Sequence, residues 1–187
     1  MPPKVRITKK DIIKTSVNLV RVSGADSINA RAIALSLKCS TQPIFSNFTS
    51  MEELEEATIK AAYEIYLSYI QNEVESGKYP KYKSFGMAYI RFAKEEKELF
   101  KLLFMRDRTG EDMSLSPDFE ESVQMIMKAN SVSYETANLI HLEMWACVHG
   151  IGTILATSFM PLEWDIISQM TSDVYHGIIS KHTKEES

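Results

Sequence analysis

Residues 133–159 form the most apolar segment of the chain, and their spacing constrains the fold more than any other feature. One row of apolar side chains recurs at intervals of three and four residues: Ala137, Ile140, Met144, Val148, Ile151 and Leu155. A second row lies beside it: Trp145, His149, Gly152 and Ala156. This spacing predicts an α-helix, capped by Ser133 and covered on two sides. We expect its two partners to be the core of its own chain and another subunit.

The same helical spacing continues through nearly the whole sequence. The 187 residues include only six prolines and seven glycines, and no stretch alternates apolar and polar residues as a half-buried strand does. The sequence therefore predicts an all-α fold. Thr8 with Asp11, and Ser50 with Glu53, match the capping-box pattern of helix starts. Gly24 is expected to close the first helix in a left-handed conformation.

Each expected helix has its own apolar face. The first helix is expected to bury Ile13, Val17 and Val20. The long helix that begins at residue 51 is expected to bury Leu54, Ala57, Ala61 and Ile65. We expect two further helices, over 81–93 and 94–105, then a loop over 106–115. Ser116 is expected to cap a helix that ends at Asn130. The last helix, over 162–181, is expected to bury Ile167, Met170, Val174 and Ile178.

Basic residues are concentrated at the start of the chain. Residues 1–50 contain eight Lys or Arg and two Asp, a local charge of +6. Residues 51–187 contain thirteen basic and twenty-three acidic residues, a charge of −10, which gives the net charge of −4. A basic segment on an acidic body indicates a polyanion partner for the basic part. We therefore predict two domains, residues 1–50 and 51–187.

Several features bear on the cellular compartment. Cys39 and Cys147 lie far apart and have neither metal-site nor disulfide-framework spacing, which suits a reducing cytoplasm. The N-terminus has no apolar run after its charges, so we expect no signal peptide. Residues 144–162 lack charged side chains, but His149, Pro161 and three hydroxyl residues interrupt a segment at the short end of spanning length. We expect a cytoplasmic protein without a membrane span.

Residues 29–48 predict two short helices joined by a tight turn. The second begins with the polar residues Ser40, Thr41 and Gln42 and continues with Ile44 and Phe48 at i and i+4. This is the pattern of a helix-turn-helix, whose second helix offers its start to a DNA groove while apolar residues anchor it. Gln42 can pair with adenine, and the Thr41 methyl can meet a thymine methyl. Basic residues placed to reach flanking phosphates are Lys9, Lys10, Lys14 and Arg31. The alternative is an ordinary helical corner with solvated polar residues.

Residues 8–66 resemble the N-terminal domain of TetR-type transcriptional regulators. The resemblance rests on the turn 23–25, the second helix from Asn29, the third helix 40–48, and the capped start of a fourth helix at 50–54. It implies a DNA-binding head over residues 1–50, with the family domain extending to about residue 66. The DNA-binding residues expected from the residue types and from this resemblance are Lys9, Lys10, Arg31, Ser40, Thr41, Gln42, Pro43, Phe45, Ser46 and Asn47.

The chain departs from the TetR pattern at four positions. Phe45 stands where the family usually has Tyr, Asn47 where His is usual, and Met51 where Lys is usual. Lys38 replaces the usual glycine of the turn. The departures at Phe45, Asn47 and Met51 favour an alternative function, a helical ligand-binding or interaction protein with a degenerate DNA-binding head.

Residues 144–150 resemble the tryptophan–histidine–glycine signature of one class of TetR-type C-terminal domains. This resemblance implies a ligand-binding and dimerisation domain over residues 51–187 and a repressor that a small molecule releases from its operator. The expected lining of a largely apolar pocket is Met87, Phe92, Phe100, Phe104, Met125, Met127, His141, Met144, Trp145 and His149, residue types that also suit a plain core. The expected homodimer interface consists of Val148, Ile151, Leu155, Ile167, Met170, Val174 and Ile178.

Candidate catalytic and metal-binding patterns are weak. His141 and His149 are separated by roughly 12 Å along a helix, too far to share a metal ion. Cys147 and His149 point to different sides of the helix, so they do not form a thiolate–imidazole pair. The sequence also lacks a glycine-rich phosphate loop. We therefore expect no enzyme activity, no metal and no cofactor.

Overall fold

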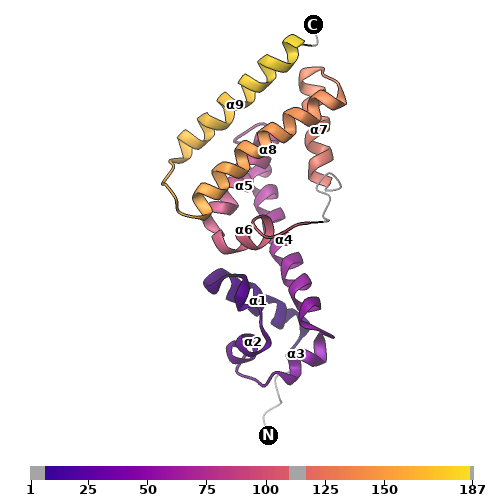
Figure 1. Cartoon of the computed structure of the whole chain (residues 1–187), viewed down its shortest axis with the longest axis vertical. Coiled ribbons are helices and arrows are strands. Elements are labelled where there is room, and N and C mark those ends of the chain that lie inside the picture. The colour runs from indigo at the N-terminus through magenta and orange to yellow at the C-terminus, as the bar shows by residue number, and fades with distance from the viewer. Residues whose placement is uncertain (1–6, 110–116, 186–187) are drawn as a thin grey trace. The chain divides into compact units, whose positions relative to one another are not determined.

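The structure, a computed structural model, describes residues 7–109 and 117–185, with side chains for 7–109 and 119–182. Within these ranges it contains α-helices, one short 3₁₀ turn at Ala25–Ser27 and no strand, so the predicted all-α fold is confirmed (Figure 1). The helices are α1 (Lys9–Ser23), α2 (Ala30–Ser36), α3 (Gln42–Asn47), α4 (Met51–Glu75), α5 (Lys81–Glu95), α6 (Lys97–Phe104), α7 (Pro117–Asn130), α8 (Tyr134–Ala156) and α9 (Trp164–Glu185). The expected cap Ser116 and most of the loop 106–115 lie outside the described residues.

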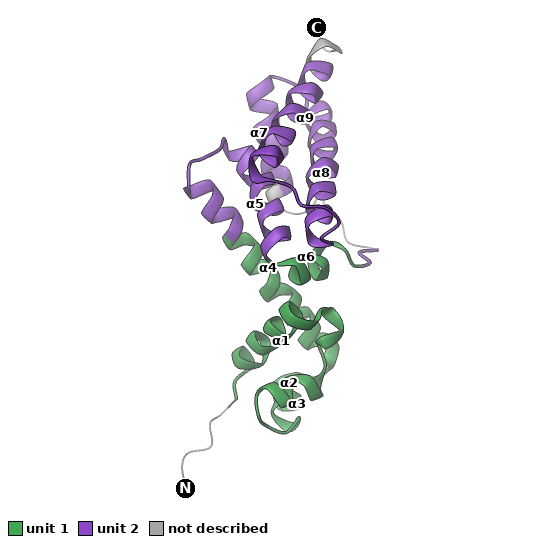
Figure 2. Cartoon of the chain, turned by 90° about the vertical axis from the view of Figure 1, so that its left-hand side faces the viewer, with its two compact units in different colours: residues 1–68, 96–106 green, residues 69–95, 107–187 purple. Residues whose placement is uncertain are grey.

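The chain forms two compact units (Figure 2). Unit 1 comprises Met1–Ser68 and Glu96–Arg106, and unit 2 comprises Tyr69–Glu95 and Asp107–Ser187. The division therefore falls within α4 and again between α5 and α6. Besides residues 1–50, unit 1 includes the first part of α4 and the whole of α6, and the predicted division into domains 1–50 and 51–187 stays a prediction. The functions expected of the two ranges remain predictions.

Helix α1 begins with the capping box expected from the sequence. Thr8 Oγ1 accepts a hydrogen bond from the Asp11 amide at 3.2 Å, and the Asp11 carboxylate accepts one from the Thr8 amide at 2.9 Å. Gly24 ends the helix with φ 77° and ψ −179°, so its ψ is extended instead of left-handed helical. That region of backbone space is essentially confined to glycine.

The core of unit 1 brings together side chains from the first four helices. Its fully buried members are Ile12, Ile33, Ala34, Ile44, Phe48 and Leu54. The expected anchors of α3, Ile44 and Phe48, are thus buried, and each contributes about 1.5–3 kcal/mol through removal of its apolar surface from water.

The predicted face of α1 is confirmed at Val17 and Val20, and that of α4 is shifted by one position after Leu54. In α1, Ile12 and Ser16 are buried with Val17 and Val20, while Ile13 is half-buried. In α4, the buried row is Leu54, Thr58, Ala62 and Tyr66, while Ala57, Ala61 and Ile65 are half-buried. The reason is a buried polar contact, in which Thr58 Oγ1 lies 2.9 Å from Ser16 Oγ and 2.8 Å from the Leu54 carbonyl. A pattern that counts only apolar residues misses both hydroxyls.

The turn between α2 and α3 is a Schellman motif with lysine at the position where glycine is usual. The Cys39 amide donates to the Ala34 carbonyl at 3.0 Å, and the Lys38 amide donates to the Leu35 carbonyl at 3.1 Å. Lys38 has φ 54°, a left-handed conformation, and such a conformation costs a residue with a Cβ roughly 1–2 kcal/mol.

We expect Lys38→Gly to raise the stability of unit 1 by up to about 1 kcal/mol, because relief of the left-handed strain exceeds the extra chain entropy of glycine. Native-state hydrogen exchange of the amides of α1 to α4 would measure the change. Lys14→Gly is the matched control, since Lys14 is exposed within α1, and it should lower stability by roughly 1 kcal/mol. A loss of similar size at Lys38 would contradict the prediction.

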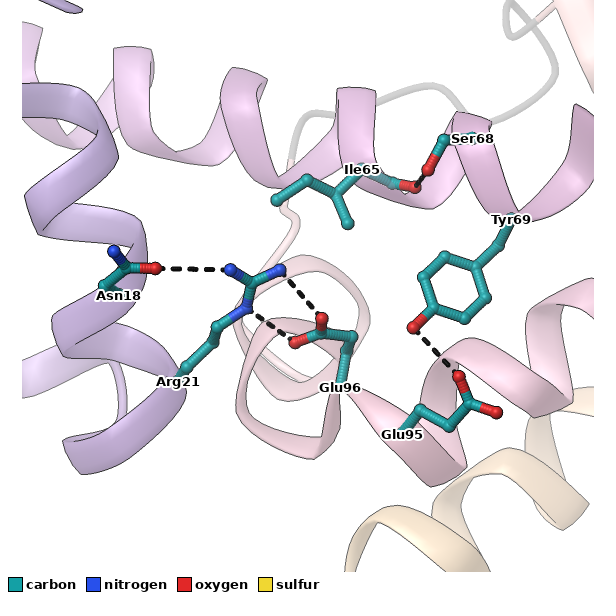
Figure 3. Close-up of polar contacts among 7 residues, drawn as sticks. All are labelled: Asn18, Arg21, Ile65, Ser68, Tyr69, Glu95 and Glu96. Atoms are coloured by element: carbon teal, nitrogen blue, oxygen red, sulfur yellow. Dashed lines mark hydrogen bonds and ion pairs between the residues drawn. The ribbon is translucent and has the colours of Figure 1, made fainter. Parts of the chain in front are cut away.

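Helix α6 packs against α1 within unit 1. Glu96, the residue before α6, accepts two hydrogen bonds of 2.8 Å from the Arg21 guanidinium (Figure 3). Asn18 Oδ1 accepts a third from Arg21 at 3.2 Å. A bidentate arginine–carboxylate pair fixes orientation as well as distance. Helix α6 also makes aromatic contacts. The centre of the Phe104 ring lies 5.2 Å from that of Tyr66 of α4, edge-on, and 5.3 Å from that of Phe100, with the two rings tilted.

In unit 2, ion pairs tie the end of α4 to α5. Glu73 is only 6% exposed, and its carboxylate accepts a hydrogen bond from Arg91 Nε at 3.0 Å. The Arg91 guanidinium also lies 4.3 Å from the centre of the Trp164 ring of α9. Tyr69 donates its hydroxyl to Glu95 at 3.0 Å (Figure 3). The buried carboxylate is thus paired, as charge burial requires.

Helix α8 packs against α5, α7 and α9. Ser133 caps it as expected, accepting a hydrogen bond from the Thr136 amide at 3.1 Å. The apolar row predicted for this helix is buried, and Gly86 of α5 approaches it so closely that a Cβ there would lie 3.3 Å from Val148 Cγ2. By length and composition α8 could cross a membrane, a test that the core helix of a soluble protein also passes.

Candidate functional site

Helix α3 presents its polar side chains outward from unit 1. At 100° per residue, Gln42 lies at the centre of the outer face, with Phe45 on one side and Ser46 on the other. All three are exposed, whereas Ile44 and Phe48 hold the opposite face in the core. Ser40 is exposed just before the helix, and Thr41 is its half-buried N-cap. Pro43 lies in the first turn, where its missing amide proton costs little.

Two of the expected DNA-binding side chains bond to their own helix. Ser46 Oγ donates to the Gln42 carbonyl at 2.8 Å. Asn47 Nδ2 donates to the Pro43 carbonyl at 2.7 Å, and Asn47 is half-buried. On the exposed outer face of α3, the Gln42 amide and the Phe45 ring thus lie beside the Ser46 hydroxyl, whose oxygen can still accept a hydrogen bond.

The expected basic contacts differ in how their charges are placed. Lys10 on α1 and Arg31 on α2 are exposed. Lys9 instead pairs with Glu53 of α4 at 2.7 Å, and its ammonium lies 4.6 Å from the centre of the Phe48 ring. Lys9 and then the Thr49 amide and hydroxyl hold the pKa of Glu53 at about 2. Lys9 would have to exchange this partner to contact a phosphate.

Glu53 completes only half of the expected second capping box. Its amide donates to Ser50 Oγ at 3.2 Å. Its carboxylate accepts hydrogen bonds from the Thr49 amide at 2.7 Å and the Thr49 hydroxyl at 2.8 Å, and not from the Ser50 amide. The carboxylate thus links the start of α4 to Lys9 as well as to the residue before Ser50.

The residues expected to line a pocket fall into different units. Phe100 and Phe104 belong to α6 in unit 1, and the others belong to unit 2. Met87 and Phe92 of α5 are fully buried, and Met144 is 6% exposed. Met125 and Met127 of α7 are half-buried.

The two expected pocket histidines each bond to a tyrosine that the sequence analysis did not single out. Tyr82 Oη lies 3.1 Å from His141 Nδ1, and Tyr89 Oη lies 2.8 Å from His149 Nδ1. Both tyrosines are on α5 and both histidines on α8. The Trp145 ring stacks on the His149 ring, with 4.9 Å between the ring centres. The signal in the sequence was the matching interval of about two helical turns, but only packing brings the two helices together.

Burial determines the charge of these four groups. It lowers the pKa of His141 to about 4 and also lowers the pKa of His149. Burial raises the pKa of both Tyr82 and Tyr89. Desolvation disfavours the charged form of each group, so at neutral pH all four are uncharged hydrogen-bonding side chains.

Groups suited to metal or thiol chemistry are not assembled within the described residues. No cluster of three or more His, Cys, Asp or Glu side chains there could hold a metal ion. Burial raises the pKa of the Cys147 thiol, which makes its thiolate less available.

The expected dimer interface requires a correction. Val148, Ile151, Leu155 and Ile167 are only 8%, 3%, 7% and 0% exposed in a single chain, so they belong to the core of unit 2. Val174 and Ile178 are half-buried, and only Met170 is directed outward. The larger exposed apolar side chains of α8 and α9 are instead Tyr134, Leu139, Leu142, Ile166 and Met170. The periodicity identified the apolar row correctly, and the structure buries it within the chain, while the surface that forms a dimer interface stays a prediction.

A scan against protein-family models finds none that matches this chain, and the curated proteins likewise contain no match.

Proposed function

We propose that the protein is a homodimeric, ligand-responsive transcriptional regulator of the TetR type, acting as a repressor. The observation that carries the proposal is helix α3, whose apolar face is buried at Ile44 and Phe48 while Gln42 stands at the centre of its outer face. A short anchored helix that directs an amide side chain outward is suited to the major groove.

The charge distribution around α3 supports a nucleic-acid partner. Lys10, Lys14 and Arg31 are exposed on α1 and α2 of the same unit, and residues 1–50 carry a charge of +6. Cations on either side of a reading helix neutralise phosphates and set its register on the duplex. Base contacts from Gln42 then supply sequence preference.

Exposed apolar side chains support a second copy of the chain as partner. On α8, Leu139 and Leu142 are 46% and 45% exposed, and the small residues Ala146 and Gly150 are exposed farther along the helix. Ile166 and Met170 of α9 are exposed as well. A two-fold dimer through the outer faces of α8 and α9 would cover these side chains. Its two heads would bind half-sites with centres about 34–36 Å apart, or a multiple of that spacing.

The proposed effector is an uncharged, largely apolar small molecule that binds in unit 2. The polar groups available to it are the Tyr82–His141 and Tyr89–His149 pairs, with the half-buried Trp145 beside them. Both tyrosines lie on α5, which ends at Glu95. The next residue, Glu96, accepts hydrogen bonds from Arg21 of α1. An effector would release DNA only by its differential affinity for two states of the protein.

We expect Gln42→Ala and Lys10→Ala to weaken operator binding in different ways. Loss of the Gln42 amide should cost about 1–3 kcal/mol on the cognate operator and relax preference at one base pair. Loss of Lys10 should weaken binding to all sequences and flatten the salt dependence by about one unit of slope. In-vitro selection of bound DNA, followed by titrations at several salt concentrations, would separate the two effects.

The same experiment tests the proposed function. An unchanged footprint and sequence preference in Gln42→Ala would remove Gln42 from the base contacts. Selection that enriches no sequence would contradict the function itself. Repeating the titrations with uncharged candidate effectors would test release.

A second candidate function is a helical interaction or ligand-binding protein whose head no longer binds DNA. Three observations favour it: Asn47 is turned into its own helix, Lys9 is neutralised by Glu53, and Phe45 lacks a hydroxyl for a phosphate. Dimer formation and effector binding without any enriched DNA sequence would support this candidate.

A further inference from the structure

The aromatic ring of Phe45 is exposed on the face of α3 that is proposed to contact DNA. Its side chain is 55% exposed, although the neighbouring Ile44 is fully buried. Exposure alone does not single it out, because Val22 and Leu35 are 84% and 80% exposed elsewhere in unit 1. What distinguishes Phe45 is that it lies on the outer face of α3, within about 60° of Gln42 around the helix.

The composition of α3 limits which bases it can read. Gln42–Asn47 contains no lysine or arginine, so the commonest specific contact, a cation with guanine O6 and N7, is unavailable from this helix. The Ser46 hydroxyl and the Asn47 amide are bonded to backbone carbonyls. The exposed groups of α3 are thus the Gln42 amide, which suits adenine, the Phe45 ring, which suits the methyl group of thymine, and the Ser46 oxygen, which can accept a further hydrogen bond.

The spacing of the two side chains along α3 is within about 1 Å of the spacing of adjacent base pairs. Gln42 and Phe45 are three residues apart, a rise of about 4.5 Å along the helix. Successive base pairs are about 3.4 Å apart. A helix lying in the major groove would therefore place the Phe45 ring over the base pair next to the one that Gln42 reads.

We infer that Phe45 recognises the C5 methyl group of a thymine in each operator half-site, so that the protein prefers an A·T-rich core. The inference rests on the proposed function and adds the class of base that the head recognises. It also gives the phenylalanine, which cannot donate a hydrogen bond to phosphate, a role in sequence readout.

The test replaces thymine with deoxyuridine, which removes the methyl group and keeps the base pairing. The full-length protein is first used to select its operator in vitro. Each thymine is then replaced in turn, in both half-sites together, and the dissociation constants are measured by fluorescence anisotropy at one salt concentration. At one position we expect about fourfold weaker binding for each methyl removed, or roughly fifteenfold for the two half-sites.

Two variants assign that effect to Phe45. Phe45→Ala should bind the thymine and deoxyuridine operators equally, and its exposed position leaves the core of unit 1 intact. Phe45→Leu keeps apolar bulk and should retain part of the preference. Leu35→Ala removes an exposed apolar side chain from α2 and should keep the full roughly fifteenfold difference.

The possible failures are distinguishable. Specific binding that is indifferent to deoxyuridine at every position would overturn the inference and leave the proposed function standing. A methyl preference that survives in Phe45→Ala would also overturn it, because another group would then read the methyl. If selection enriches no sequence, the proposed function and this inference fail together.

Discussion

Replacing Leu142 with glutamate is expected to convert the proposed dimer into monomers. Leu142 is 45% exposed on the outer face of α8, so the substitution leaves the core of unit 2 intact. In a two-fold dimer it would bury two unpaired carboxylates, each at a cost of roughly 3–5 kcal/mol. Because the two costs together reach at least about 6 kcal/mol and 1.4 kcal/mol is a factor of ten, we expect the dissociation constant of the dimer to rise at least about ten-thousandfold. Sedimentation equilibrium would measure it.

The choice of residue matters for this experiment. Ile151 belongs to the interface expected from the periodicity, but its side chain is 3% exposed within one chain. Ile151→Glu would therefore unfold unit 2 and would give no information on association. Ala129→Glu on the exposed surface of α7 is the matched control and should leave the oligomeric state unchanged. A dimer of unchanged affinity in Leu142→Glu would move the interface away from the outer face of α8.

Operator binding should fail along with dimerisation. A monomer contacts one half-site, so the gain from linking two heads on one duplex is lost. We expect Leu142→Glu to bind the full operator no more tightly than a single half-site. This readout connects the α8 surface to function without requiring any knowledge of the effector.

Acid is expected to destabilise unit 2 through His141. Burial lowers the pKa of this histidine from 6.5 to about 4, and the side chain contacts Tyr82 of α5 and the Phe119 ring of α7. As pH falls below 6.5, the unfolded chain binds a proton that the folded chain does not. The stabilisation is therefore complete above pH 6.5 and is lost progressively between pH 6.5 and about 4. Between pH 7 and pH 4 the loss from this group is up to about 3 kcal/mol.

Tryptophan fluorescence provides a probe of this change, because Trp145 and Trp164 both lie in unit 2. Denaturant unfolding should be measured at several pH values between 7 and 4. His141→Phe keeps an aromatic ring at the site and should reduce the slope of stability against pH in that range. His176→Phe, at an exposed position of α9, should keep the full slope. Equal slopes in wild type and His141→Phe would show that His141 is not buried in its neutral form.

Local sequence signals predicted the parts of the fold that depend on neighbouring residues. The capping box at Thr8 and the anchors Ile44 and Phe48 are present as expected, because hydrogen bonds and helical faces act over three or four residues. The buried face of α4 differs from the expected one, and Ser16 joins the buried face of α1, because Ser16 and Thr58 form a hydrogen bond in the interior. A hydrogen bond between two side chains that are far apart in the sequence leaves no pattern that either segment shows by itself.

The candidate sites show the same limit. The outward position of Gln42 followed from the helix period, whereas the turning of Asn47 onto the Pro43 carbonyl and the pairing of Lys9 with Glu53 did not. His141 and His149 were visible as polar groups on an apolar helix. Their tyrosine partners were not, since Tyr82 and Tyr89 lie on a different helix more than fifty residues away.

By itself, the sequence determined that the chain is helical, where several of its helices begin, and which rows of side chains are apolar, because those properties are set by short-range periodicity and capping. Only the tertiary structure decided what covers each row. The row of Val148, Ile151 and Leu155 is buried by its own chain, and Leu139 and Leu142 are exposed instead. A helix with apolar residues on more than one side can turn any of these sides toward its own core. The packing of α5, α7 and α9 around α8 determines which side is buried within the chain.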